Sequence, residues 1–162
     1  MNTRDLAITL GTLFGELVEG AAASGGYMLN AGDQGLLRSL EGLSATAASA
    51  PTSTGSSIAA HVDHIRYGLS LMNRWSAGDD PFTDADWGAS WKKTTVSDAE
   101  WQRLRADLRA EATRWLHTLR TPREVQEIEL NGMIGSIAHL AYHLGAIRQI
   151  NTALRGPVES KG

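Results

Sequence analysis

Residues 130–154 read LNGMIGSIAHLAYHLGAIRQINTAL, and this stretch decides the fold class. Its large apolar residues recur three or four positions apart, the spacing that gathers side chains on one face of an α-helix. They are Leu130, Met133, Ile137, Leu140, Leu144 and Ile147. Gly156-Pro157 follows and is typical of a helix stop. The stretch therefore predicts a long helix from about 130 to 154.

Three further segments repeat apolar residues with helical spacing. The first helix is expected over about 2–22, with a leucine stripe inward and Glu16 and Glu19 outward. The second runs from Ser57 to about Trp75. The third begins at Ser97-Asp98-Ala99-Glu100, which has the pattern of a capping box, and ends near residue 120.

The remaining segments are shorter or lack a period. A helical piece is expected around 33–43, a loop over 45–57, and a long loop over 78–96 whose tryptophans pack back on the protein. No run alternates as a strand does. Four long helices predict an all-α protein built as a four-helix bundle.

Composition limits the function classes. The chain has 162 residues, enough for one domain over 1–162, and its 15 basic and 18 acidic residues give a net charge of −3. Nucleic acid and anionic membranes are therefore disfavoured as partners. With no cysteine, any metal must be held by His, Asp or Glu. The apolar N-terminal stretch is interrupted by acidic residues, so we expect a helix of a cytoplasmic protein rather than a signal peptide.

Four of the five histidines form two close pairs, His61 with His64 and His139 with His143. Residues four apart on a helix project about 40° from one another, so His139 and His143 can direct two imidazoles at one ion. Small residues share their sector and leave room for water or substrate: Gly132, Gly135, Ser136 and Ala146. An HxxxH pair is also found on ordinary polar helix surfaces, so the spacing alone does not establish a site.

A third ligand has to come from another helix. On the helix that begins at Ser57, His61 lies near the middle of the apolar arc and His64 towards its edge. Periodicity leaves open which of the two is a ligand and which is a hydrogen-bonded core histidine.

Two motifs resemble those of the DinB/YfiT-like superfamily. Residues 139–149, HLAYHLGAIRQ, match that family's closing pattern H-x-x-x-H-x-G-x-I-R-Q. Residues 57–65, SIAAHVDHI, resemble its other motif, in which a histidine follows a Ser or Thr by seven positions. The resemblance covers nearly the whole chain and implies an up-down-down-up bundle with a metal site at His64, His139 and His143. His61 stands where the family usually has an aliphatic residue.

Three imidazoles without a thiolate suit Zn, Ni or Fe in the divalent state. Such an ion lowers the pKa of bound water or activates a thiol. His61 and Tyr142 are candidates to support the ligands, and no catalytic residue is identified. Asp63, Glu127 and Glu129 are expected on the solvated surface rather than as a general base.

The predicted function is therefore a metal-dependent enzyme that acts on a small molecule, either a hydrolase or a transferase that uses a low-molecular-weight thiol. The alternative is a non-catalytic, stress-related module that binds a ligand or stores a metal.

A homodimer is also predicted, because Phe14 and Val18 widen the apolar face of the first helix beyond the needs of one partner helix. Alternatively, these two side chains cover the loop at 44–56.

Overall fold

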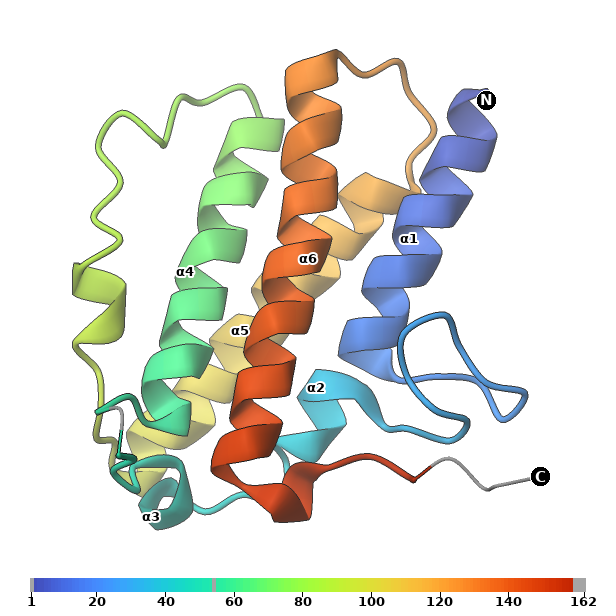
Figure 1. Ribbon diagram of the computed structural model, residues 1–162. Coiled ribbons are helices and arrows are strands. Elements are labelled where there is room, and N and C mark those ends of the chain that lie inside the picture. Colours follow the sequence, from blue (N-terminus) through green and yellow to red (C-terminus); the bar gives the residue numbers. More distant parts are fainter. Residues whose placement is uncertain (1, 54, 159–162) are drawn as a thin grey trace. The chain divides into compact units, whose positions relative to one another are not determined.

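The computed structural model describes residues 2–53 and 55–158. The regular secondary structure of these residues is helical, with no strand and a single isolated bridge between Ala22 and Gly25. The all-α prediction is confirmed (Figure 1). The α-helices are α1 (Thr3–Glu19), α2 (Gly35–Ser39), α3 (Ala45–Ala48), α4 (Ile58–Ser76), α5 (Asp98–Arg120) and α6 (Glu127–Ile150), and the 3-10 helices are η1 (Ala89–Trp91) and η2 (Thr152–Leu154).

The chain divides into two compact units. The first comprises Met1–Glu41 and Leu119–Gly162 and contains α1, α2 and α6. The second comprises Gly42–Thr118 and contains α3, α4, η1 and all but the end of α5. Among the described helices, none has the length and apolarity required to cross a bilayer.

In the first unit, α1 contacts both α2 and α6. It ends at Glu19, before the predicted residue 22, because Gly20 adopts a φ of 106° that L side chains avoid. A Cβ at Gly20 would also collide with the carbonyl oxygen of Asp33. The backbone N–H of Ala21 donates to that same oxygen, so the chain turns here instead of continuing the helix.

Glu16 does not face solvent as the sequence predicted. Its side chain is buried, with 7% of the residue exposed, and its carboxylate accepts hydrogen bonds from the backbone N–H groups of Tyr27, Met28 and Leu29. Three consecutive amides of the α1–α2 connection thus share one carboxylate as their acceptor, in hydrogen bonds that are partly buried. The carboxylate of Glu16 therefore shapes this connection.

Replacing Glu16 with Gln is expected to lower the free energy of unfolding by about 1–3 kcal/mol, because an amide side chain has one acceptor oxygen and loses the charge-assisted bonds. Urea denaturation measures the loss. Glu19→Gln is the matched control, since Glu19 is exposed and pairs with exposed Arg120 at 3.3 Å. Equal stability losses in the two variants would contradict the structural role of Glu16.

α6 begins earlier and ends earlier than predicted. Gln126 and Glu129 form a capping box at its start, with the Glu129 carboxylate accepting from the Gln126 N–H at 3.0 Å. At Asn151 the backbone becomes extended and the Asn side chain accepts from the N–H of Ala153. Residues 152–154 are therefore a separate 3-10 turn rather than the last turn of the helix.

In the second unit, α4 and α5 begin where the sequence predicted. The Ser57 hydroxyl accepts from the N–H of Ala60 at the start of α4. At the start of α5, the Glu100 carboxylate accepts from the Ser97 N–H, and the Ser97 hydroxyl accepts from the Glu100 N–H. Both caps satisfy amides that have no partner within the helix.

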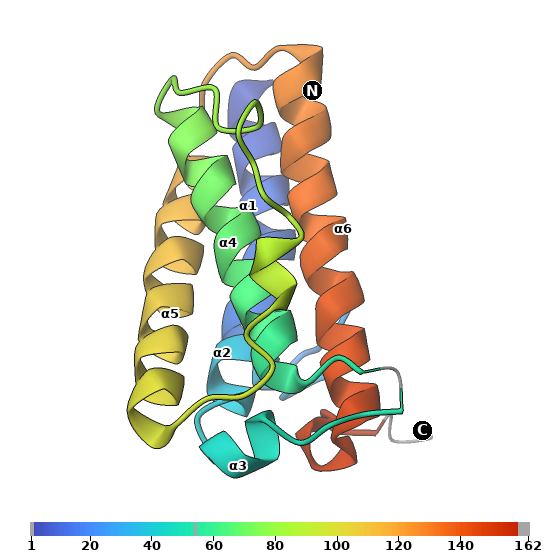
Figure 2. The same cartoon turned by 90° about the vertical axis from the view of Figure 1, so that its left-hand side faces the viewer.

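Two predictions for the shorter segments need correction. Residues 45–57 are not all loop, because Ser44 caps the one-turn helix α3 by accepting from the N–H of Ala47. The piece expected at 33–43 is helical only over α2. In the 78–96 loop, η1 lies against α4, which both views show (Figures 1 and 2).

The two residues that widen the apolar face of α1 are buried. Phe14 and Val18 are both shielded from solvent, so they leave no exposed apolar strip on which a dimer could form. The homodimer stays a prediction without support from this helix.

Candidate functional site

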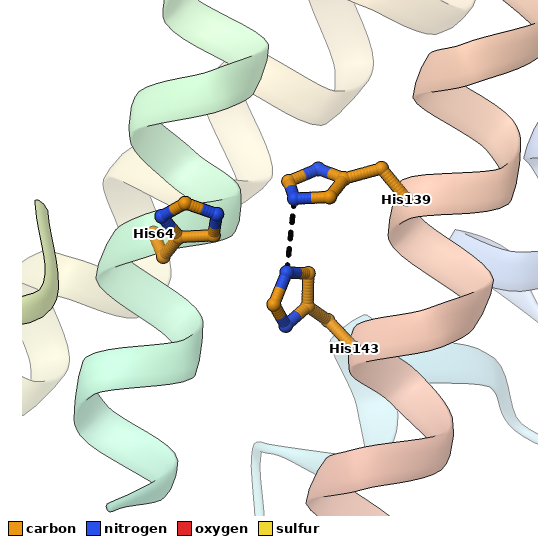
Figure 3. A group of neighbouring side chains, drawn as sticks. All are labelled: His64, His139 and His143. Carbon is orange, nitrogen blue, oxygen red and sulfur yellow. Dashed lines mark hydrogen bonds between the residues drawn. The ribbon is translucent and has the colours of Figure 1, made fainter. Parts of the chain in front are cut away.

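His139 and His143 lie together on one face of α6 in the first unit. Their Nε2 atoms are 2.9 Å apart and the rings meet edge to face, with centroids 4.4 Å apart (Figure 3). His143 is 2% exposed and His139 is half-buried. Nitrogens that bind one tetrahedral zinc ion at about 2.0–2.1 Å lie roughly 3.3 Å apart, so a small opening of this pair would admit the ion.

The surroundings of this pair are open on one side. A Cβ added at Gly135, one helical turn before His139, would meet no atom within 4 Å. Tyr142 is 70% exposed, and its ring meets that of His143 at a centroid distance of 5.0 Å. The small-residue sector predicted around the histidines therefore includes free space at Gly135.

His64 lies on α4 in the second unit and is 7% exposed (Figure 3). Its Nδ1 atom is 2.7 Å from the hydroxyl oxygen of Ser90. Its ring stacks on Trp91, with centroids 4.3 Å apart and an interplanar angle of 23°, and also contacts Trp87. All three contacts come from η1 and the residues just before it, so this short helix fixes the position of the imidazole.

His61, one turn before His64, is equally buried. Its ring meets Trp91 edge to face at a centroid distance of 5.1 Å. Trp91 thus packs against both histidines of the α4 pair, and Ser90 contacts His64.

The candidate carboxylates are either exposed or paired with neighbouring groups. Asp63 is buried rather than solvated, contrary to the prediction, because it pairs with Arg66 of the same helix at 2.8 Å. Glu127 is exposed as predicted, and Glu129 caps α6 and pairs with Arg123 at 2.9 Å. Each of these groups has a structural or solvent-facing position.

Burial lowers the pKa of both His61 and His139 below the ordinary value of 6.5. The cause is desolvation, which disfavours the charged imidazolium. Both rings are therefore neutral at neutral pH, and the neutral form is the one that binds a metal ion.

These lowered pKa values predict that the metal-free protein loses stability as the pH falls below 6.5. In that range the unfolded chain binds protons that the folded protein does not, so stability rises with pH. Urea midpoints at about pH 7.5 and about pH 5.5 measure the effect. His61→Asn should flatten the dependence. A pH dependence as steep in His61→Asn as in the wild type would contradict this account.

Sequence reasoning did not find Ser90. It lies in an aperiodic loop, and no motif linked it to a histidine 26 positions earlier. The tryptophans of this loop were predicted to pack back on the protein, and Trp91 does so.

No family model matches this chain, and no curated protein and no solved structure shows a significant similarity to it.

Proposed function

We propose that His64, His139 and His143 together bind one divalent metal ion, with Zn, Ni and Fe as the candidates. The observation that carries this proposal is the facing pair of Nε2 atoms of His139 and His143, 2.9 Å apart on one helix. Each of the three residues offers one imidazole nitrogen, and such a group could hold a metal ion. An all-nitrogen donor set fits these metals and leaves coordination positions for water or substrate.

The resemblance to DinB/YfiT-like proteins supports the same three residues and extends the proposal to the fold. On that basis the chain is one domain over 1–162, a four-helix bundle with up-down-down-up topology. Metal binding would then stabilise the folded protein, since the unfolded chain has no assembled site.

We further propose that the site is catalytic and that the protein is a metal-dependent hydrolase or thiol-dependent transferase. A metal ion held by these residues would lower the pKa of a bound water molecule or thiol towards neutrality. The chain contributes the ring orientation of its histidines, with His61 and Tyr142 as candidate supports. Support for access by a small molecule comes from the open space at Gly135 and the exposed Tyr142 beside His143.

The experiment is to purify the protein without chelators and to measure its metal content by mass spectrometry. We expect about one divalent ion per chain, consistent with a three-histidine site. The loaded protein is then assayed against thiol conjugates and simple esters, with His143→Ala as the inactive control. Metal without turnover would favour the non-catalytic binding module, and absence of metal from a folded protein would overturn the site.

The proposed cytoplasmic location and homodimer rest on the sequence alone. Light scattering tests the dimer: a mass near 17.4 kDa that stays constant as the protein is concentrated would contradict it.

A further inference from the structure

Ser90 is almost fully buried, and its hydroxyl oxygen has two partners. It lies 2.7 Å from the carbonyl oxygen of Trp87 and 2.7 Å from Nδ1 of His64. A carbonyl oxygen accepts and never donates, so the single hydroxyl proton of Ser90 goes to Trp87. The oxygen must then accept from His64, which places a proton on Nδ1.

The proton on Nδ1 determines which ring nitrogen of His64 is able to bind a metal ion. A neutral imidazole carries one N–H and one lone pair. With the proton held at Nδ1, the lone pair of His64 is on Nε2. A metal ion binds an imidazole through a lone pair, so Nε2 is the atom of His64 that is able to coordinate.

The short helix η1 also fixes the plane of the His64 ring. Trp91, next to Ser90 in η1, stacks on His64 at 4.3 Å. η1 is itself anchored, because Asp86 accepts from the N–H of Ala89 through Oδ1 and donates its own N–H to the hydroxyl of Tyr67 on α4. The hydrogen bond to Ser90 and the stacking on Trp91 thus fix both the tautomer and the orientation of His64.

We propose that Ser90 is a positioning residue that holds His64 in the Nδ1–H tautomer and so presents Nε2 to the metal ion. The tautomer follows from contacts within the second unit, whereas its consequence for metal affinity rests on the proposed function. Groups that hydrogen-bond to a ligating histidine typically affect metal affinity by about 10–100-fold.

The test uses the full chain labelled with ¹⁵N-histidine, free of metal, at a pH where the imidazoles are neutral. Long-range ¹H–¹⁵N spectra report which ring nitrogen of His64 carries the proton, and His64→Ala assigns the signal. We expect the proton on Nδ1 in the wild type and a shift towards the Nε2–H form in Ser90→Ala. Ser90→Thr retains a hydroxyl and should restore the wild-type pattern.

Ser70→Ala is the matched control. The hydroxyl of Ser70 also donates to the carbonyl oxygen three residues earlier, that of Tyr67, at 2.7 Å. Unlike Ser90, it makes this bond on the surface of a long helix rather than beside the ring of His64. Circular dichroism checks that every variant folds. A wild-type proton on Nε2, or an unchanged tautomer in Ser90→Ala, would overturn the inference.

Zinc titration of the same variants tests the consequence for affinity. We expect the dissociation constant of Ser90→Ala to rise by about 10–100-fold and those of Ser90→Thr and Ser70→Ala to stay near the wild-type value. If the wild type binds no zinc while His64 holds the Nδ1–H form, the proposed function fails and the tautomer assignment stands. If zinc binds tightly and Ser90→Ala leaves the affinity unchanged, the positioning role fails and the metal site stands.

Discussion

Replacement of either His139 or His143 with alanine is expected to reduce divalent metal affinity by more than about 100-fold, since even residues that only support a ligand contribute about 10–100-fold. Each substitution removes one of three proposed ligands and leaves a pair that cannot complete the site. Both side chains lie on α6, and most of the buried residues of this helix are aliphatic or Met rather than these histidines. We therefore expect both variants to retain their helicity. Zinc titration with a competing chelator measures the loss, and circular dichroism checks the fold.

Two other histidines serve as controls for this result. His117→Ala should leave the affinity unchanged, because His117 is exposed near the end of α5. His61→Ala should retain the metal if His64 is the ligand of α4. Loss of metal in His61→Ala with retention in His64→Ala would exchange the roles of the two residues, and full occupancy in His139→Ala or His143→Ala would refute the proposed triad.

Replacement of Trp101 with alanine is expected to lower the free energy of unfolding by about 3–5 kcal/mol, the usual cost of truncating a buried aromatic side chain. Trp101 is 2% exposed, and its indole Nε1 donates to the carbonyl oxygen of Leu43 at 2.7 Å. The substitution leaves a cavity and a buried carbonyl without its partner. Denaturant unfolding of the metal-free protein measures the change.

Trp101→Phe separates the two contributions, because it keeps most of the ring volume and removes the hydrogen bond. Its cost should fall between zero and that of Trp101→Ala. Phe82→Ala is the control at a half-exposed aromatic residue and should change stability far less. A Trp101→Ala variant as stable as Phe82→Ala would contradict the packing described for the second unit.

Features that depend on local spacing could be predicted from the sequence. The apolar repeat predicted α4, and the Ser97–Glu100 pattern predicted the start of α5, because both patterns depend on residues three or four positions apart in the chain. The i, i+4 spacing likewise predicted that His139 and His143 share a face, and their Nε2 atoms lie 2.9 Å apart.

Features that depend on contacts between distant residues could not be predicted in this way. Glu16 fits a solvent-facing position on α1, and its partners are backbone amides 11 to 13 residues later, groups that nearly every residue carries and that leave no mark in the sequence. Ser90 acquires its role because η1 folds against α4, and α3 forms because Ser44 caps a segment with no apolar period. The missed features therefore depend on which distant residues a loop contacts, and the periodicity of the sequence does not contain that information.

The central claim is the proposed metal site at His64, His139 and His143. A crystal structure of the zinc-loaded protein, with anomalous data collected on both sides of the zinc absorption edge, tests it most directly. We predict one anomalous peak per chain at about 2.0–2.1 Å from a nitrogen of each of three histidines, His64, His139 and His143. A peak coordinated by His139 and His143 without His64, or located elsewhere in the molecule, would contradict it.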